Sequence, residues 1–215
     1  MGPYARWLKR GADLALASAG LLVAAPILGA VAAGVAVKLG RPVLFRQRRA
    51  GRHAEPFSIL KFRTMTDGRG PDGELLPDAQ RMTDFGRWLR STSLDELPEL
   101  LNVLRGEMSL IGPRPLHLRY VPRYNGRQSR RHDVLPGITG LAQVRGRNAL
   151  SWTERLELDV IYAQSVGFGL DLQILLETVL VTLRRQGITQ EGQATMTEFR
   201  GEEGAIAGTA RAKAA

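Results

Sequence analysis

The pattern of apolar and polar positions divides the chain into one long apolar segment followed by shorter segments of mixed character. Residues 14–37 contain no charged side chain, and about 20 apolar residues suffice to cross the hydrocarbon core of a bilayer. Pro26 lies near the middle of this run, where a proline removes a backbone donor and kinks or breaks a helix. The pattern therefore predicts a membrane-embedded helix that is broken at Pro26.

Basic residues flank this run on both sides, at positions 6, 9 and 10 before it and at six positions between 38 and 52 after it. Because basic flanks are retained in the cytoplasm, both are best accommodated if the chain enters the membrane and returns. We therefore predict a re-entrant hairpin that turns at Pro26, with each arm reaching roughly half the bilayer. A single spanning helix is the alternative. We also expect Lys9 and Asp13, four residues apart, to pair on one helix face.

The pattern after the apolar run is typical of a β-hairpin followed by a loop. Residues 43–47 and 56–64 are expected to form strands that pair across the intervening turn. Alternation places Lys61 and Arg63 on one face, either as part of a site or as charges on a solvated edge. Residues 66–80 are rich in Gly and Pro, which indicates a loop that acts as a lid or is a plain surface loop.

Four later segments have the apolar spacing of helices: 84–90, 95–104, 152–166 and 171–186. Ser93 and Glu96 have the spacing of a capping box at the start of the second helix, and Asp171 is expected to cap the last one. We expect the apolar face of the last helix to pack in the core, with a surface-lying membrane helix as the alternative.

The order of these elements predicts an α+β protein that is mostly helical. We expect a re-entrant membrane helix in residues 1–40 and a small cytoplasmic domain with a short β-hairpin in residues 41–201. Residues 202–215 are rich in Gly and Ala and are expected to form a disordered tail.

Composition narrows the classes of partner. The chain has no cysteine, which excludes disulfides and thiolate metal sites. Its net charge is +9, with 26 arginines against 4 lysines, which indicates an anionic partner such as lipid headgroups, phosphorylated substrates or nucleic acid. Aromatic residues make up only 6% of the chain and are not interleaved with the basic ones, which counts against a nucleic-acid stacking surface. The three histidines lack metal-ligand spacing.

One adjacent pair of carboxylates, Asp95 and Glu96, lies within an arginine-rich stretch. Carboxylates can hold a divalent cation or attack phosphorus, and guanidinium groups grip phosphate oxygens in a bidentate manner. A rigid Gly-Pro-Arg-Pro turn at 112–115 presents Arg114. The neighbouring arginines are Arg81, Arg87, Arg90, Arg105, Arg114 and Arg119.

Several blocks in a fixed order resemble one family. They are Lys9-Arg10 with Asp13, the apolar hairpin, residues 61–65 (Lys-Phe-Arg-Thr-Met), the Asp95-Glu96 pair, Gly112-Pro113-Arg114-Pro115 and residues 136–148. Over about residues 6–201 the chain resembles the bacterial sugar transferase family, the monotopic polyprenol-phosphate phosphoglycosyl transferases. The short chain, without an N-terminal multi-span domain, resembles the minimal catalytic unit of this family. Residues 146–152, 157–159 and 194–199 most resemble the undecaprenyl phosphate N,N'-diacetylbacillosamine 1-phosphate transferase branch.

The resemblance implies a reaction at the cytoplasmic face of the bacterial inner membrane. A sugar 1-phosphate would pass from a UDP-sugar to undecaprenyl phosphate, with Mg2+ as cofactor and UMP released. Asp95 would attack the β-phosphorus and form a covalent phosphosugar intermediate, Glu96 would position the metal or the acceptor, and either carboxylate would hold the metal. The positions that would line the phosphate or nucleotide-sugar site are Lys61, Arg63, Arg90, Pro113, Arg114 and Arg147.

The resemblance also leaves alternatives open. Ala25 stands where the family often has Ser before the proline, and Leu141 and Arg145 stand where the branch commonly has Trp and Asn. The donor is expected to be UDP-N,N'-diacetylbacillosamine or a related acetamido sugar, with UDP-glucose, UDP-galactose or a UDP-N-acetylhexosamine as alternatives. Membrane lipid and a possible homodimer are the other expected partners, without nucleic acid. A non-catalytic basic protein of the membrane surface is the alternative from another class.

Overall fold

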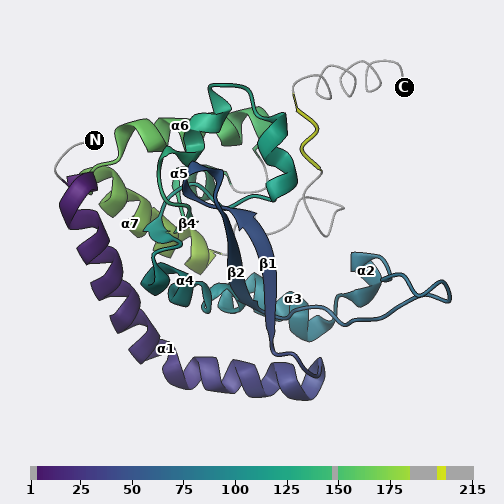
Figure 1. Ribbon diagram of the computed structural model, residues 1–215. Coiled ribbons are helices and arrows are strands. Elements are labelled where there is room, and N and C mark those ends of the chain that lie inside the picture. The colour runs from purple at the N-terminus through teal and green to yellow at the C-terminus, as the bar shows by residue number, and fades with distance from the viewer. Residues whose placement is uncertain (1–3, 147–149, 185–197, 202–215) are drawn as a thin grey trace.

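The apolar run lies within one long helix, α1 (Lys9–Lys38), which follows a π-helical turn at Tyr4–Leu8. The computed structural model describes residues 4–146, 150–184 and 198–201, so the tail predicted at 202–215 lies outside the described residues. Within those ranges the protein is α+β and mostly helical, as predicted, with one long apolar N-terminal helix and a small β-hairpin (Figure 1).

Helix α1 bends but does not break. Pro26 lies inside the helix, and Figure 1 shows α1 as two arms that meet at a wide angle, the first descending along the body and the second running beneath it. The expected break at Pro26 is therefore wrong, since a proline removes one backbone hydrogen bond and kinks a helix whose other bonds can persist. The re-entrant path through a membrane stays a prediction.

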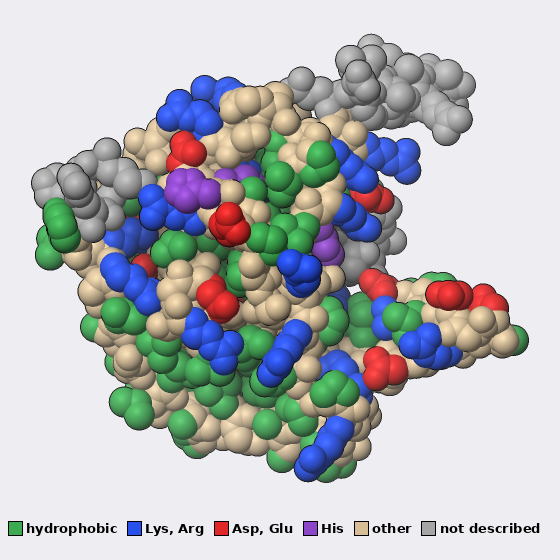
Figure 2. Space-filling view, in the orientation of Figure 1, with side chains coloured by type: hydrophobic (Ala, Val, Ile, Leu, Met, Phe, Trp, Pro, Cys, Tyr) green, Lys and Arg blue, Asp and Glu red, His purple; other side chains and the backbone are tan. Residues whose placement is uncertain are grey.

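Each arm of α1 packs on the rest of the protein along one side. In the first arm Ala17 is buried against Ile59 and Val103, and in the second Val35 is buried against Phe62 and Leu89. The outward side is apolar and exposed, with Leu22, Val23 and Val37 among the most exposed side chains. Figure 2 shows hydrophobic side chains gathered over α1, at the lower left and bottom of the view. By length and composition α1 could cross a membrane.

The predicted β-hairpin is confirmed. Strand β1 (Leu44–Ala50) pairs antiparallel with β2 (Pro56–Phe62), with Leu44 opposite Phe62 and Ala50 opposite Pro56. The first strand runs three residues beyond its predicted end, and the turn is a short 3-10 segment at Arg52–Ala54. Figure 1 shows the hairpin standing upright in the middle of the molecule.

Two of the predicted helices have nearly the expected bounds. Helix α3 spans Asp84–Ser91 and α6 spans Trp152–Ser165. Between β2 and α3, the predicted loop projects away from the body (Figure 1) and closes with one short helix, α2 (Asp78–Arg81). Whether this loop acts as a lid stays a prediction.

The helix predicted over 95–104 begins later and in two parts. A 3-10 turn at Leu94–Glu96 is followed by α4 (Glu99–Arg105). After α4, strand β3 (Ser109–Ile111) runs parallel to β4 (Gly137–Thr139), and α5 (Leu141–Arg145) follows. Two 3-10 segments, Leu118–Arg123 and Gln128–Asp133, connect the strands.

Helix α7 (Phe168–Arg184) begins three residues before its predicted start, so Asp171 lies in its first turn and is not its N-cap. One side of α7 packs in the core, as expected, because Ile174 is fully buried. Several other apolar side chains of α7 are about half exposed, namely Phe168, Leu172, Leu176, Val179 and Leu180.

The polar residues at the start of α1 bind the body of the protein, and the expected Lys9–Asp13 pair is not formed. Lys9 Nζ lies 2.7 Å from Asp171 Oδ2, and the Leu110 amide donates to Asp13 Oδ1 at 3.0 Å. Arg10 donates to the carbonyls of Val103 and Leu104 at the end of α4. These contacts place the start of α1 against α4, β3 and α7.

Candidate active site

The Asp95–Glu96 pair lies in a tight turn between α3 and α4. Ser93 precedes it in the left-handed region, with φ 56° and ψ 16°, and its side chain makes no capping hydrogen bond. The predicted capping box is therefore wrong, because Ser93 has the backbone of a strained turn and Glu96 is engaged elsewhere. Strain of this kind costs about 1–3 kcal/mol and persists where surrounding contacts enforce it.

Glu96 is held between two cations from different parts of the chain. Lys61, from β2, donates to Glu96 Oε1 at 2.6 Å, and Arg114, from the 112–115 turn, donates to the same oxygen at 2.5 Å. Burial alone would raise the pKa of Glu96, but Arg114 and Lys61 together hold that pKa well below its usual range. Glu96 is therefore an ionised carboxylate with a fixed position.

Asp95 is buried without such partners. It is 7% exposed, and its carboxylate accepts no hydrogen bond from the residues in the described ranges. Burial, followed by the charge of Glu96, raises the pKa of Asp95 to about 6, while Lys61, Arg90 and Arg114 oppose the shift. An anionic oxygen with little solvation and no fixed hydrogen bond is poised to bond to an electrophile or a metal.

A third carboxylate, Glu99, completes the group and was not singled out from the sequence. It is 1% exposed, and its Oε1 lies 3.0 Å from Lys61 Nζ. Glu99 lies four residues after Asp95, so the i, i+4 spacing of the two acids was the signal that could have found it.

A buried asparagine, which no sequence motif indicated, fixes the distance between β2 and α4. The Leu60 amide donates to Asn102 Oδ1 at 3.0 Å, and Asn102 Nδ2 donates to the Ser58 carbonyl at 2.8 Å. These bonds hold β2 to α4 and so bring Lys61 next to Glu96 and Glu99.

Two other predicted residues, Arg90 and Pro113, are held by hydrogen bonds to segments next to the site. Arg90 Nε donates to Thr64 Oγ1 at 3.1 Å, and burial lowers the pKa of Arg90 against the opposing charge of Asp95. Pro113 is buried, and its carbonyl accepts from the Gly137 amide at 3.0 Å. A Cβ on Gly112 would meet the Leu135 carbonyl oxygen at 2.4 Å, so this close approach requires glycine and fixes the turn that presents Arg114.

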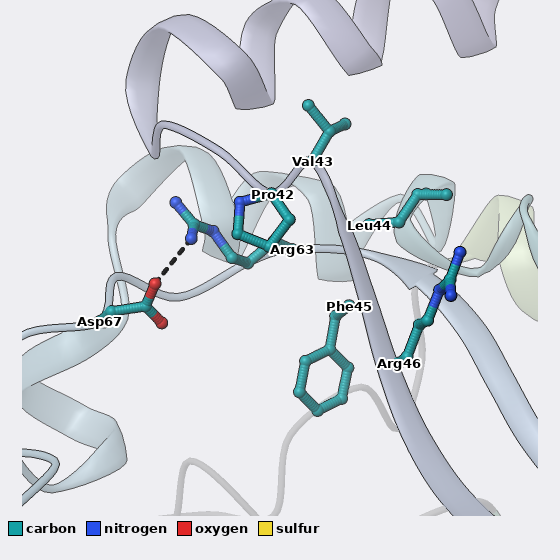
Figure 3. A pocket seen from close by; sticks show the side chains of 7 residues that line it. All are labelled: Pro42, Val43, Leu44, Phe45, Arg46, Arg63 and Asp67. Carbon is teal, nitrogen blue, oxygen red and sulfur yellow. Dashed lines mark hydrogen bonds and ion pairs between the residues drawn. The ribbon is translucent and has the colours of Figure 1, made fainter.

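Arg63 is not brought to the carboxylate group. Strand β2 ends at Phe62, and Arg63 Nη1 binds Asp67 Oδ2 at 2.7 Å and the Arg41 carbonyl at 3.2 Å. Figure 3 shows this pair at one end of a hollow of about 680 Å3, which is also lined by residues 42–46. The alternation that placed Lys61 and Arg63 together ends with the strand. Arg147 lies outside the described residues.

The donor set suits a hard cation only in part. Magnesium binds through one or two carboxylates together with substrate phosphates and water. Asp95 has two oxygens without a hydrogen-bond donor in the described ranges, whereas Glu96 Oε1 is already used by Lys61 and Arg114. The described residues contain no ready-made cluster of three metal-binding side chains. A magnesium ion here would therefore depend on substrate oxygens.

Comparison with known proteins finds similarity to sugar transferases over most of the chain. A family model described as bacterial sugar transferase matches residues 4–185. The chain is 50% identical over 194 residues to an uncharacterized sugar transferase, EpsL, of Bacillus subtilis (strain 168), covering 90% of this chain and 96% of that protein. It is 41% identical over 181 residues to a UDP-glucose:undecaprenyl-phosphate glucose-1-phosphate transferase of Caulobacter vibrioides, covering 80% and 68% of the two chains.

A third relative names a different sugar. The chain is 37% identical over 199 residues to an undecaprenyl-phosphate galactose phosphotransferase of Salmonella typhimurium, covering 85% of this chain but only 42% of that protein. The names of these relatives state glucose or galactose where they state a sugar. The expected diacetylbacillosamine branch therefore finds no support in them, because the short runs that suggested it are outweighed by similarity over most of the chain.

Proposed function

The chain belongs to the bacterial sugar transferase family, and from this premise we propose that Asp95 carries a covalent phosphosugar between two anionic substrates. The protein is a phosphoglycosyl transferase that acts on a UDP-sugar and undecaprenyl phosphate. It transfers a sugar 1-phosphate to the lipid phosphate. The proposal assigns a role in this transfer to each residue of the site and selects the sugar.

The proposed reaction has two displacements at the same phosphorus. An Asp95 oxygen bonds to the β-phosphorus of the UDP-sugar, the bond from that phosphorus to the bridging oxygen breaks, and UMP leaves. An oxygen of undecaprenyl phosphate then bonds to the phosphorus, the bond to Asp95 breaks, and the carboxylate is restored. Splitting the transfer in this way avoids a direct encounter of two anionic substrates.

The observation that carries this proposal is the contrast within the acidic pair. Glu96 is fixed by Lys61 and Arg114, whereas Asp95 is buried and accepts no hydrogen bond within the described part of the chain. Lys61 and Arg114 have further N–H groups that can offset charge on the transferred phosphoryl group. Arg90 lies near enough to Asp95 for its charge to stabilise the carboxylate, and it supports Asp95 in our proposal.

We include Mg2+ in the proposal, held by Asp95 or Glu96 together with substrate phosphate oxygens. When bound, the ion would offset negative charge on the diphosphate and assist departure of UMP. The carboxylates of this chain supply the hard oxygen donors that such an ion prefers.

The relatives with named sugars favour a neutral hexose donor. They are named for UDP-glucose or for galactose, so we propose UDP-glucose or UDP-galactose in place of the acetamido sugar expected from the sequence.

The first test is nucleotide release by purified protein in nanodiscs with Mg2+, undecaprenyl phosphate and a panel of UDP-sugars. We expect UMP with UDP-glucose or UDP-galactose, and an intact protein mass increased by one hexose phosphate when the lipid is left out. Release of UDP would indicate ordinary glycosyl transfer and contradict the role of Asp95. UMP formed only with an acetamido donor would contradict the choice of sugar alone.

A non-catalytic protein of the membrane surface predicts a different outcome. Such a protein would bind anionic vesicles or duplex nucleic acid with a steep dependence on salt and would release no nucleotide from any donor. That result would overturn the proposed reaction, whatever the sugar.

We further propose that the protein lies in the bacterial inner membrane, with α1 as its membrane segment and the site on the cytoplasmic face. A protein with a polyprenyl substrate works next to a membrane, and the exposed side of α1 is apolar from Leu14 to Val37 apart from Ser18. Basic residues at both ends of α1 favour a helix that returns to the cytoplasm.

Since the chain has no cysteine, single cysteines can test this topology in whole cells. Trp7 is 73% exposed at the start of α1, and the Arg87 side chain is 59% exposed on α3. For a re-entrant helix we expect Trp7→Cys and Arg87→Cys both to be unreactive toward an impermeant thiol reagent added outside. Reaction at position 7 alone would show that α1 spans the membrane.

A further inference from the structure

Glu99 is the most deeply buried charged side chain beside the proposed nucleophile, and the proposed reaction does not use it. It is 1% exposed and is the first residue of α4. Removing a carboxylate from water is costly unless its partners compensate. A charge in this position therefore needs either a structural or a functional reason.

The contacts of Glu99 give little structural reason. Its ion pair within the described ranges is with Lys61, whose Nζ is 3.0 Å from Glu99 Oε1 and 2.6 Å from Glu96 Oε1. Oε1 of Glu99 accepts no aligned hydrogen bond in that part of the chain, whereas Glu96 accepts one from Lys61 and one from Arg114. Glu99 therefore attracts the ammonium group of Lys61 without fixing it in one direction.

The electrostatics of Glu99 agree with this interpretation. Burial is the main reason that the pKa of Glu99 is raised to about 7, and the negative charge of Glu96 adds to it, while Lys61 and Arg114 oppose both. A buried carboxylate whose ionisation is unfavourable does not stabilise the fold, and an apolar residue of similar volume often serves the fold as well or better.

We propose that Glu99 is a positioning residue for Lys61, an inference that rests on the proposed function. Its carboxylate draws the ammonium group toward α4, so that Lys61 is shared between Glu96, at 2.6 Å, and Glu99, at 3.0 Å. An ammonium group has three N–H donors. One of them is directed to Glu96, and Glu99 attracts the ammonium group without an aligned hydrogen bond, so an N–H donor remains for a phosphate oxygen of the UDP-sugar.

The proposal predicts a specific kinetic defect. In Glu99→Leu, Lys61 is held by Glu96 alone, and the donor phosphate has to compete with that pair. We expect the KM for the UDP-sugar to rise about 10-fold while kcat changes less than about 3-fold. Glu99→Gln, which keeps the shape and one acceptor oxygen, is expected to have an intermediate effect.

A double-mutant cycle separates positioning from general damage to the site. In a Lys61→Met background, Glu99→Leu is expected to change the KM less than about 2-fold, because its effect acts through the lysine. Equal effects in both backgrounds, or an unchanged KM in the wild-type background, would overturn the proposal. Glu157→Gln is the matched control, because Glu157 is an exposed glutamate paired with Arg127 away from the site, and its KM is expected to equal that of the wild type.

A second measurement does not depend on activity. The chain has only four lysines, so 13C labelling at lysine Cε gives four resonances, and Lys61→Arg identifies that of Lys61. We expect Glu99→Leu to shift the Lys61 resonance and to leave the other three in place. Glu99→Gln carries the same test if the leucine variant does not fold.

The kinetic and the NMR measurement together distinguish the positioning role of Glu99 from the proposed function. A missing shift at Lys61 overturns the positioning role even if the enzyme is active. A clear shift in a protein that releases no UMP from any donor supports the Lys61–Glu99 coupling but contradicts the proposed function, and with it the role of the coupling in binding phosphate.

Discussion

Two groups of carboxylates in this protein are buried to the same extent but differ in their hydrogen bonds. Asp159 and Asp171, which hold helices together, are 2% and 3% exposed, and Asp95 and Glu99 of the site are 7% and 1% exposed. Arg131 donates twice to Asp159 Oδ2, at 3.1 and 2.7 Å. Asp171 accepts from Tyr4, Lys9 and Tyr162. Asp95 accepts no hydrogen bond in the described ranges.

The difference shows how burial can serve either structure or chemistry. A buried carboxylate with two or more directed donors is neutralised and locked in place, so it links segments that are far apart in sequence. A buried carboxylate without such donors retains its nucleophilicity, at the cost of stability. Exposure alone would not separate the two groups, but the count of directed donors does.

The largest expected effect is the loss of chemistry in Asp95→Asn. An amide cannot form the covalent intermediate, so we expect UMP release to fall at least about 1000-fold while the protein remains folded and bound to membranes. The measurement is single-turnover UMP release, with the protein mass after incubation with donor as a second readout. Turnover within about 10-fold of the wild type would contradict the nucleophilic role.

The next effect concerns the structural group. Arg131→Met leaves Asp159 buried without its partner, and we expect the free energy of unfolding to fall by about 3–5 kcal/mol. Replacing both partners, in Arg131→Met/Asp159→Leu, is expected to recover most of that loss. Thermal unfolding in detergent measures both variants. If the double variant is as unstable as the single one, the pair is not the source of the effect.

A smaller effect tests the difference between the structural carboxylates and Asp95. We expect Asp95→Asn to increase the stability of the protein although it abolishes activity. The pKa of Asp95 is about 6 in the folded protein and about 3.9 in an unfolded chain. The folded state therefore binds the proton more tightly, and stability falls as the pH rises from about 4 to 6.

From this shift we expect Asp95→Asn to raise the free energy of unfolding by about 2 kcal/mol at pH 8, and the difference to vanish near pH 4. Thermal unfolding of the two proteins across that pH range is the measurement. Asp84→Asn is a suitable control, because Asp84 is an exposed aspartate on α3. A variant that is destabilised at pH 8 would show that Asp95 also has a structural role.

The smallest effect tests the contact between α1 and α4. Arg10 donates to the carbonyls of Val103 and Leu104 in the last turn of α4, and the Val103 carbonyl also accepts from the Gly106 amide. Carbonyls in the last turn of a helix lack the donors that lie four residues further on inside a helix. Arg10→Met is expected to lower the free energy of unfolding by about 1–2 kcal/mol. Arg105→Met, at an exposed position on α4, is the control and should change stability by less than about 0.5 kcal/mol.

The sequence predicted the elements well where local patterns decide them. The β-hairpin, α3 and α6 follow from alternation and helical spacing, and the α+β class follows from their order. The start of α4 did not, because Ser93 and Glu96 have the spacing of a cap while tertiary contacts give Glu96 to Lys61 and Arg114.

Long-range partners were the part that sequence patterns could not supply. Lys9 is four residues from Asp13 but binds Asp171, which is 162 residues away. Lys61 and Arg63 were expected on one face, but the strand ends between them. Asn102 gave no motif signal, and the i, i+4 spacing of Asp95 and Glu99 did not indicate that Glu99 would meet Lys61, since both roles depend on how β2 lies against α4. Such contacts depend on packing, which local spacing does not encode.

The contacts of α1 have a consequence for how this protein can be divided. Val35 covers Phe62 and Leu89, and Arg10 closes the end of the helix that begins at Glu99. A soluble fragment that starts after residue 40 would thus lose part of its own core and the cap of its central helix. We expect it to aggregate in water even when supplied with an artificial anchor, because α1 supplies part of the core on which the catalytic part packs.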